Sequence, residues 1–382
     1  MRVYLDNAAT TKVDPAVFEA MTPYLMDNYG NPSSIHQHGR EAKAALETSR
    51  RKIASYLNAA PSEIFFTSGG TEADNMALVC SIDTKGIKHA YTSKVEHHAV
   101  LHTLETQKKA GKIELTFAEL DELGHVNLDH LEEWLKSHPN ALVSLMHANN
   151  EIGNLLDIDR VGAMCQEYGA VFHSDTVQAV GHYKHDLQQL KVNSLCGAAH
   201  KFHGPKGSGF LYLNSDHKIH PLIHGGAQER NMRGGTENIA GIVGLAKALE
   251  LAYEHMDEHR THIEKLKARM IQKLKEQVDE IAFNGDSANM ATSLYTVLNV
   301  CLPPSDENEM LIFNLDINKV SASGGSACSS GSQVGSHVLA ALKDRDPKRG
   351  AIRFSFSKFN TTEDIDYAVG KLAEIVNEAQ MA

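Results

Sequence analysis

Short apolar runs alternate with amphipathic stretches along the first two thirds of the chain. The runs with the length and composition of buried strands are "EIFFTS" (63–68), "ALVSLMH" (141–147) and "AVFHSD" (170–175). Between them lies "LDHLEEWLKSH" (128–138), in which three leucines recur at helical spacing. Strands that alternate with helices predict an α/β fold built on a buried, parallel sheet.

The pattern changes towards the end of the chain. From about Ile242 to Gln277 an amphipathic stretch predicts one long helix. The strand-like runs after it are "EIAFNGD" (280–286), "SLYTVLNVCL" (293–302), "KVSASGG" (319–325) and "AIRFSFSKF" (351–359). We therefore expect a large domain over residues 15–255 and a smaller α+β domain made of residues 1–14 and 256–382.

Composition and charge narrow the function classes. The chain has 382 residues, 42% of them hydrophobic and 22% charged, with a formal net charge of −11. A negative balance gives no general attraction to nucleic acid or anionic membranes. Asp6 interrupts the place where a signal peptide needs apolar residues, and no run of about 18 apolar residues could span a bilayer. We expect a cytoplasmic protein whose partners are small molecules or proteins, with no nucleic acid and no membrane.

The five cysteines form no C-x-x-C pair, so neither a disulfide framework nor a zinc knuckle is indicated. Four have apolar surroundings and are expected to be small buried hydrophobes: Cys80, Cys165, Cys196 and Cys301. Cys328 differs, because it lies in "SASGGSACSSGSQ" (321–333), where small residues predict a loop open to water. On these residues alone, Cys328 is either an inert thiol or a reactive one.

A possible anion site lies in "FFTSGGTEADNMAL" (65–78). A strand there runs into Gly69, Gly70 and Thr71 and then into a helix, so free backbone N–H groups and the positive helix end converge. The motif is neither G-x-G-x-x-G nor a P-loop, and a plain strand-to-helix turn would have the same sequence.

Two further residues have surroundings that suit chemistry. Asp175 follows a strand at its carboxyl end, where open α/β sheets bind ligands, although a helix N-cap would also use an aspartate. Lys201 lies among small residues in "GAAHKFHGPKG" (197–207), where a sheltered amine loses basicity, although a surface lysine is the simpler reading. Together, an anion cradle, an acid and a sheltered amine meet the requirements of pyridoxal phosphate.

Ten motifs, in order over nearly the whole chain, resemble those of the cysteine desulfurases of the class V aminotransferase group. They are "YLDNAATT", "GNPSSIHQHGR", "TSGGTEADN", "KVEHHAV", "MHANNEIGN", "HSDTVQAVG", "HKFHGPKG", "QERNMRGGTEN", "GGSACSSGS" and "IRFSFS". The resemblance implies the fold-type I PLP-dependent transferase fold, with a mostly parallel mixed sheet in the large domain. It also implies pyridoxal 5'-phosphate as cofactor. The long loop around Cys328 resembles the group that serves iron–sulfur cluster assembly and transfer RNA thiolation.

The resemblance also assigns roles to individual residues. Lys201 would bind the cofactor as an imine and later move a proton, and Asp175 would keep the ring nitrogen protonated. His97 would stack on the ring and act as acid and base. The other implied cofactor and substrate contacts are Gly70, Thr71 and His200 at the phosphate, and Gln178 and Asn150 at the phenolic oxygen and the bound substrate.

Three further roles concern the substrate and the assembly. Arg353 would clamp the substrate carboxylate through two parallel N–H···O bonds. Thr236 resembles a threonine that reaches the phosphate of a neighbouring subunit, which implies a homodimer. Cys328 would take the sulfur of bound L-cysteine as a persulfide, leave L-alanine, and pass the sulfur to an iron–sulfur scaffold or another acceptor protein.

The alternatives are a class V transaminase, a selenocysteine lyase, and a metal-binding helix. A transaminase or lyase of the same fold would share Lys201, Asp175 and Arg353, but it has no use for Cys328. The third rests on His255, His259 and His262, which fall on one predicted helix face, but a solvated polar face explains them equally well and we expect no metal site.

The chain departs from the family pattern in one place. Ala198 stands where the family usually has a phosphate-binding serine, and Ala199 stands where it has glycine. A missing hydroxyl donor costs about 1 to 3 kcal/mol if nothing replaces it.

Overall fold

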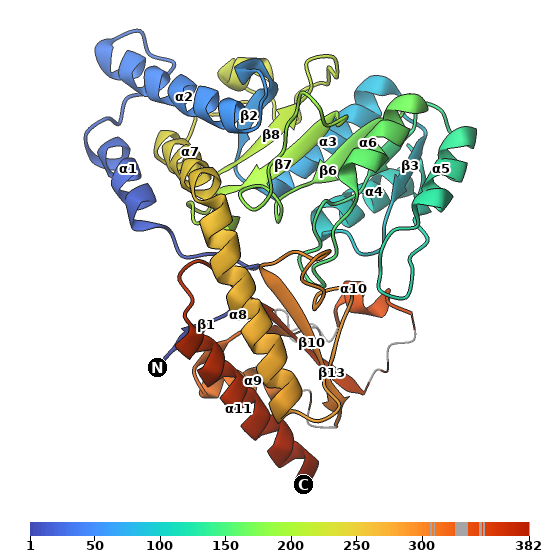
Figure 1. Ribbon diagram of the computed structural model, residues 1–382. Helices are drawn as coiled ribbons and strands as arrows, with labels where there is room; N and C mark the ends of the chain where they lie inside the picture. Colours follow the sequence, from blue (N-terminus) through green and yellow to red (C-terminus); the bar gives the residue numbers. More distant parts are fainter. Residues whose placement is uncertain (306–307, 309, 325–334, 344–345, 347, 382) are drawn as a thin grey trace.

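A computed structural model describes residues 1–305, 308, 310–324, 335–343, 346 and 348–381 (Figure 1). Two lobes are visible, each built around its own sheet. The helices of the upper lobe are α1 (Pro15–Met26), α2 (Gln37–Tyr56), α3 (Gly70–Lys85), α4 (His98–Lys109), α5 (Leu128–Ser137), α6 (Ile158–Glu167) and α7 (Ile239–Glu254). Its short 3₁₀ turns are η1 (Pro61–Glu63), η2 (Ala199–Lys201) and η3 (Gln228–Asn231).

The upper sheet has the strand order β2-β8-β7-β6-β5-β3-β4. Its strands are β2 (Ile64–Thr67), β3 (His89–Thr92), β4 (Glu114–Phe117), β5 (Leu142–Ser144), β6 (Val171–Asp175), β7 (Ser194–Ala198) and β8 (Gly209–Leu213). All neighbouring pairs are parallel except the two that involve β8. The predicted class is therefore confirmed, as a mostly parallel mixed sheet with helices, and the three predicted strands of this lobe are β2, β5 and β6.

Both faces of this sheet are covered, which explains why its strands are apolar throughout rather than alternating. Phe65 and Phe66 are consecutive in β2, so they point to opposite faces. Phe65 packs in a cluster with Met76 of α3, whereas Phe66 packs in a cluster with Ile53 of α2 and Leu245 of α7.

The lower lobe has a four-stranded sheet in the order β12-β13-β10-β9 and a parallel pair, β1 with β11. Its strands are β1 (Val3–Tyr4), β9 (Ala282–Phe283), β10 (Val297–Pro304), β11 (Val320–Ser321), β12 (Ser323–Gly324) and β13 (Arg349–Ser355). Its helices are α8 (Met256–Gln277), α9 (Leu311–Ile317), α10 (His337–Ala340) and α11 (Thr362–Met381). Each predicted strand region of the lower lobe contains a strand, although "EIAFNGD" contributes only the two residues of β9.

The stretch predicted as one helix consists of two, α7 and α8, which meet at His255. The backbone of His255 leaves the helical region, with φ −111° and ψ 19°. The prediction of a single helix was wrong at this residue, because apolar periodicity continues across the break and gives no sign of it.

The break coincides with a change of core, and we propose the domain boundary there. Ala252, before the break, packs in the cluster of the upper lobe, and Ile263, after it, packs in the cluster of the lower lobe. Val3 and Leu5 belong to the lower cluster as well. These contacts support a large domain over 15–255 and a small domain of 1–14 and 256–382.

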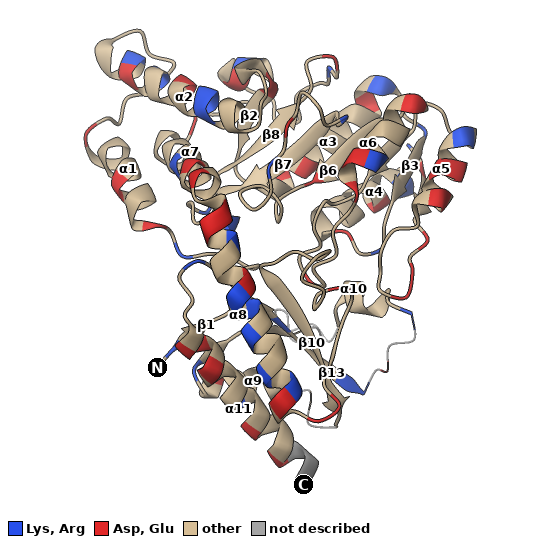
Figure 2. Cartoon of the chain, viewed as in Figure 1, with Lys and Arg blue, Asp and Glu red and all other residues tan. Residues whose placement is uncertain are grey.

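Charges of both signs are interspersed along α2, α5 and α8 (Figure 2). In the lower lobe they hold two helices together, since Asp366 of α11 accepts from Arg269 at 2.6 Å and from Lys273 at 2.8 Å, both on α8. Within the described residues, no helix combines the length and the hydrophobicity that crossing a membrane requires.

The open edge of β2 is closed by side chains rather than by another strand. Glu229 accepts the Phe66 backbone N–H at 2.8 Å, and Arg50 donates to the Ile64 carbonyl at 2.7 Å. Arg50 and Glu229 are themselves joined by two hydrogen bonds of 2.7 and 2.8 Å, with side chains only 2% exposed. Breaking this buried pair from one side leaves an uncompensated charge.

We expect Glu229→Ala to lower the free energy of unfolding by about 3 to 5 kcal/mol, because Arg50 would stay buried without its partner. Urea denaturation followed by circular dichroism measures the change. Glu47 is the matched control, because it contacts the same guanidinium at 3.3 Å but is 38% exposed. Glu47→Ala should cost less than about 1 kcal/mol, and equal losses in the two variants would contradict the expectation.

Candidate functional site

The topology places most of the predicted site residues at one edge of the upper sheet. The strands β2, β3, β5, β6 and β7 run in the same direction, so their carboxyl ends meet there. The residues that follow these ends are Gly70 and Thr71 after β2, His97 after β3, Asn150 after β5, Asp175 and Gln178 at β6, and His200 and Lys201 after β7. Two predicted residues come from elsewhere: Arg353 from β13, and Thr236 from the segment between η3 and α7.

Lys201 lies in η2, with its amine turned to the N-terminal segment. Its Nζ donates to the carbonyl oxygens of Ala8 at 2.5 Å and Ala9 at 3.0 Å. Burial, and next to it the nearby Arg353 charge, lower the pKa of Lys201 to about 8, while Asp175 and Asp6 oppose the shift. A useful fraction of the amine is therefore neutral near physiological pH, as a nucleophile or base requires.

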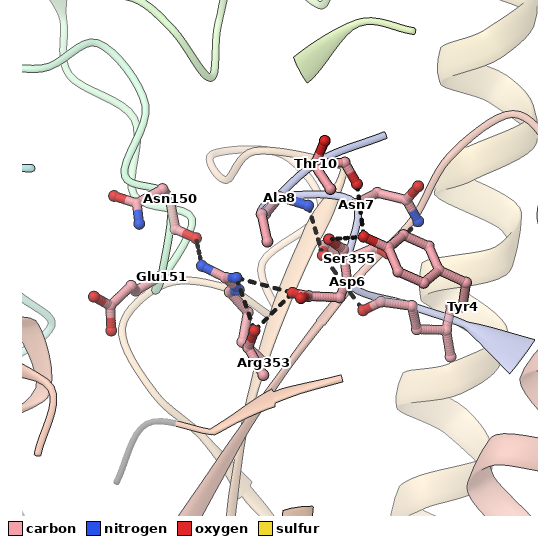
Figure 3. A network of polar contacts seen from close by, with 12 residues as sticks. Tyr4, Asp6, Asn7, Ala8, Thr10, Asn150, Glu151, Arg353 and Ser355 are labelled. Carbon is pink, nitrogen blue, oxygen red and sulfur yellow. Dashed lines mark hydrogen bonds and ion pairs between the residues drawn. The ribbon is translucent and has the colours of Figure 1, made fainter. Parts of the chain in front are cut away.

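The N-terminal segment bonds to other site residues as well. Ala8 also accepts from Gln178 Nε2 at 2.9 Å, and Thr10 Oγ1 lies 3.3 Å from His200 Nδ1. Asp6 binds Arg353, whose Nη2 lies 3.0 Å from the Asp6 Oδ1 (Figure 3). This segment contains "YLDNAATT", which is among the family motifs, but sequence reasoning assigned none of its residues to the site.

Asp175 ends β6 and is 4% exposed. Burial and the neighbouring Asp74 raise its pKa to about 6, and His97 is the largest opposing charge. The Oδ1 of Asp175 accepts the Val177 backbone N–H at 2.9 Å. No ion pair of the described residues includes Asp175, so its carboxylate suits a cation that the chain does not supply.

A cluster of buried polar side chains lies next to Asp175. The Cys196 thiol donates to Asp74 Oδ1 at 2.8 Å and lies 3.7 Å from Asp175 Oδ1. His173 Nε2 is 3.3 Å from the same Asp74 oxygen, but without hydrogen-bond geometry. Burial raises the pKa of Cys196 well above its usual value, so this thiol is a neutral donor. Sequence reasoning had treated Cys196 as a plain buried hydrophobe, and burial itself is confirmed for all four cysteines expected to be buried.

Metal-ligating side chains gather at one point in the described ranges. The Asp74, His173 and Cys196 ligand atoms lie within 4.8 Å of one another, and the Cys196 thiol already donates to Asp74. The three histidines of the predicted helix face do not come together in this way, since His255 caps the break and His262 bonds to the Asn360 carbonyl at 2.9 Å.

His97 is exposed at the start of α4 and caps that helix. Its Nδ1 accepts the Ala99 backbone N–H at 3.1 Å, so in the neutral ring the proton is on Nε2. The free Nε2–H and the exposed ring face leave His97 able to stack on a ligand and to exchange a proton with it.

The start of α3 has the form of an anion cradle. A Cβ at Gly70 would lie 2.5 Å from Val177 Cγ2, so only glycine lets the first turn of α3 pack this closely on the end of β6. Thr71 is exposed next to it. Burial, followed by Lys201, lowers the pKa of His200 to about 4, which makes His200 a neutral donor. Ala198 lies buried at the end of β7, facing Gly70, and offers no hydroxyl.

Arg353 extends to the site from β13 and is 9% exposed. Its Nη1 donates to the Asn150 carbonyl at 2.9 Å, while the Asn150 side chain extends away from it (Figure 3). Its Nε is buried without a hydrogen-bond partner among the described residues. This donor is the part of the guanidinium that a carboxylate could take.

Cys328 lies outside the described residues, within 325–334. The described residues on either side of that segment are bonded close to Arg353. Ser323 donates to Asp6 Oδ1 at 2.7 Å, and Ser336 donates to Glu151 Oε2 at 2.5 Å. Ser323 also accepts from Arg353 Nη2 at 3.2 Å, and Glu151, the partner of Ser336, follows Asn150, whose carbonyl accepts from Arg353.

Thr236 is exposed, in a segment tied to the anion cradle. Arg233 donates to both oxygens of Glu72, at 2.9 and 3.1 Å, and Glu72 is in the first turn of α3. The structure brings Thr236 into no described contact with Lys201 of the same chain.

A cleft adjoins Lys201 and Gln178 from the side of α7 and α8. Its other walls include His182, His203 and His259. Asp175, His97 and Gly70 do not line it, so this cleft is a different space from the one at the carboxyl edge of the sheet.

Three comparisons with known proteins show what this chain is similar to. The family model described as Aminotransferase class-V matches residues 3–368. A relative named "Cysteine desulfurase IscS" from Dictyoglomus turgidum is 43% identical over 380 residues, which cover 98% of this chain and 95% of the relative. The solved NifS-like protein from Rickettsia africae is 32% identical, with a TM-score of 0.88, over 99% of this chain and 100% of that one. A structure described as "SspA in complex with cysteine" is 30% identical, with a TM-score of 0.80, over 94% of this chain and 100% of that one.

The pKa of Lys201 gives a prediction for the cofactor-free protein. Reductive alkylation with a small aldehyde needs a neutral amine, so modification of Lys201 should rise with pH through a midpoint near 8. At pH 7 roughly one such amine in ten is neutral, against fewer than about one in a thousand for an ordinary lysine. Peptide mass spectrometry after borohydride reduction measures the extent of modification at each lysine.

Lys267 is the matched control for accessibility. Burial also lowers its pKa, to about 7, but its side chain is fully buried and bonded to Ser293 and Leu294. Lys267 should therefore stay unmodified in the folded protein. A midpoint above pH 10 for Lys201 would contradict the expected shift.

Proposed function

The chain belongs to the aminotransferase class-V family, and we propose that it is a cysteine desulfurase that converts L-cysteine to L-alanine and leaves a persulfide on Cys328. One observation carries this proposal more than any other. An amine, Lys201, and a carboxylate-binding group, Arg353, are bonded to the same turn, at Ala8 and Ala9 and at Asp6. A free amino acid is the substrate that offers partners to both.

We propose pyridoxal 5'-phosphate as the cofactor, and the residues fit it. The close packing at Gly70 leaves the first backbone N–H groups of α3 for a phosphate, with Thr71 and His200 beside them. Asp175 offers a buried carboxylate without a cation, which fits a protonated ring nitrogen. When bound, the cofactor would supply an electron sink for bond cleavage beside the α-carbon.

The residues of the chain then have separate tasks. Arg353 would bind the substrate carboxylate, with its unpartnered Nε as one donor. Lys201 would take the proton from the α-carbon and return it, since its lowered pKa suits both directions near neutral pH. His97 would donate or accept a proton at Nε2, and Asn150 and Gln178 would orient the substrate and the cofactor.

The sulfur step is assigned to Cys328. Its thiolate would attack the sulfur of bound cysteine, so that an S–S bond forms, the C–S bond breaks, and the carbon takes a proton to give alanine. Burial raises the pKa of the other candidates, to about 11 for Cys80 and about 12 for Cys165, which disfavours their thiolates.

We further propose that the persulfide sulfur passes to an acceptor protein for iron–sulfur cluster assembly or transfer RNA thiolation. The relatives named IscS and the structures named NifS-like support this class of role. Release of alanine from cysteine distinguishes the desulfurase from a transaminase, which would release an oxo acid.

A homodimer is the proposed assembly. Exposed apolar side chains gather on α1 and the segment after it: Phe18, Leu25, Met26, Tyr29 and Ile35, which are 57 to 91% exposed. A surface of this kind suits burial against a second copy of the chain. Thr236 is exposed and makes no described contact with the Lys201 of its own chain, and it would then complete the phosphate site of its neighbour.

Cys328→Ser tests the sulfur step. The variant should still bind cysteine, because Lys201 and Arg353 are unchanged, but it should release almost no alanine, since a hydroxyl is a far weaker nucleophile than a thiolate. The measurements are alanine released per active site and the protein mass, which should gain about 32 Da per bound sulfur only with Cys328 present. Cys165→Ala is the control and should keep its turnover. Near-normal alanine release from Cys328→Ser would reject the assignment.

Mixed dimers test the shared site. In a dimer of one Thr236→Ala chain and one Lys201→Ala chain, the site that keeps Lys201 also receives an intact Thr236 if the threonine comes from the neighbour. Cofactor affinity at that site, measured by absorbance titration, should equal that of the wild type. An affinity as weak as in the Thr236→Ala homodimer would show that Thr236 acts within its own chain.

A further inference from the structure

The guanidinium of Arg353 is held by oxygen atoms from three separate segments. Asn150 provides a carbonyl to Nη1 at 2.9 Å, and Asp6 and Ser323 provide a carboxylate and a hydroxyl to Nη2 at 3.0 and 3.2 Å (Figure 3). Asp6 is the one charged acceptor of the three. Charge-assisted bonds are the stronger ones, so Asp6 contributes most to the orientation of this group.

The contact between Asp6 and Nη2 matters because Nη2 takes part in both ways in which arginine binds a carboxylate. A carboxylate can bind a guanidinium through two parallel bonds in two ways, to Nε with Nη2 or to Nη1 with Nη2. Both ways include Nη2, the nitrogen that Asp6 fixes in Arg353. The Asp6 and Ser323 oxygens are only 2.7 Å apart, so they share one side of Nη2 and leave its other N–H available. The buried Nε has no hydrogen-bond partner among the described residues, and a carboxylate bound to Nε and Nη2 would satisfy it.

Asp6 itself is fixed by the strand that carries Arg353. The next residues are bonded to Ser355, since the Ala8 N–H donates to Ser355 Oγ at 2.8 Å and the Asn7 side chain donates to the Ser355 carbonyl at 2.8 Å. Asp6 forms an isolated bridge with Ser355 as well. These bonds hold the backbone of Asp6 in place, so its carboxylate keeps the Arg353 guanidinium in one position.

The same turn also holds the amine. The carbonyls of Ala8 and Ala9, two and three residues after Asp6, accept the Lys201 Nζ. Because the backbone between them is short and bonded at both ends, the separation of the guanidinium and the amine is set within a single turn. A substrate whose amine and carboxylate share one carbon is selected by that separation.

We propose that Asp6 is a positioning residue, which orients Arg353 for the α-carboxylate of the substrate and sets its distance from Lys201. This inference rests on the proposed function, in which Arg353 binds that carboxylate. It adds that recognition of an α-amino acid, as opposed to a simple amine, depends on the Asp6 carboxylate.

The test compares two probes that carry no sulfur and differ only in the carboxylate, L-alanine and ethylamine. Their dissociation constants are measured by calorimetry on the cofactor-loaded wild-type protein and on Asp6→Ala and Asp6→Asn. Asp6→Ala should bind L-alanine about tenfold more weakly and ethylamine within about twofold of the wild type. Asp6→Asn keeps an acceptor oxygen and should lose about threefold for L-alanine, which also serves if Asp6→Ala does not fold.

Asp14 provides the matched control. It too belongs to the N-terminal segment and forms an ion pair with the lower lobe, to Lys358 at 2.6 Å, but it does not touch Arg353. Asp14→Ala should leave the ratio of the two dissociation constants unchanged.

The outcomes separate this inference from the proposed function. If the wild type binds L-alanine no better than ethylamine, the role of Arg353 is wrong and the role of Asp6 is overturned with it. If the wild type prefers L-alanine and both Asp6 variants keep that preference, only the role of Asp6 is overturned. Equal weakening of both probes in the Asp6 variants would mean a general structural effect and would also reject the positioning role.

Discussion

The hydrogen bonds from Lys201 to the carbonyls of Ala8 and Ala9 join the upper lobe to a turn that the lower lobe holds in place. The turn stays where it is because Ser355, at the end of β13, bonds to its backbone. The amine of one lobe is therefore positioned by a strand of the other. A complete site requires both lobes to be folded and the first ten residues of the chain to lie between them, which makes the N-terminal segment part of the chemistry and not only part of the fold.

Burial also shifts the pKa of three titratable groups of the site, each in the direction that reduces its charge. It lowers the pKa of Lys201 to about 8 and that of His200 to about 4, and it raises that of Asp175 to about 6. Desolvation is the largest cause in each case, because it penalises whichever form is charged. In the proposed site a phosphate would meet the neutral His200 and backbone N–H groups, whereas a substrate carboxylate would meet the charged guanidinium of Arg353.

The sequence predicted those parts of the fold and site that depend on local pattern. Strands β2, β5 and β6 are long apolar runs, and Lys201, Asp175 and Gly70 stand out through small or apolar neighbours. It missed β7 as a strand, because "SLCGA" has little β-branched or aromatic content, and it missed the break at His255. It also could not find the roles of Asp6 and Asp74, since each depends on a partner far away in the chain, at Arg353 and at Cys196. Such pairs arise from topology, which no local pattern encodes.

The side chains that close the edge of β2 have a consequence for assembly. Edge strands normally invite another strand to pair with them, and the same exposed N–H and C=O groups lead to aggregation. Here the Phe66 N–H is bonded to Glu229, and the Ile64 carbonyl is bonded to both Arg50 and Arg230. The sheet cannot be extended across this edge by a second molecule without first displacing a buried ion pair. In the proposed homodimer, association is thereby directed away from strand exchange and towards helical surfaces such as the apolar face of α1.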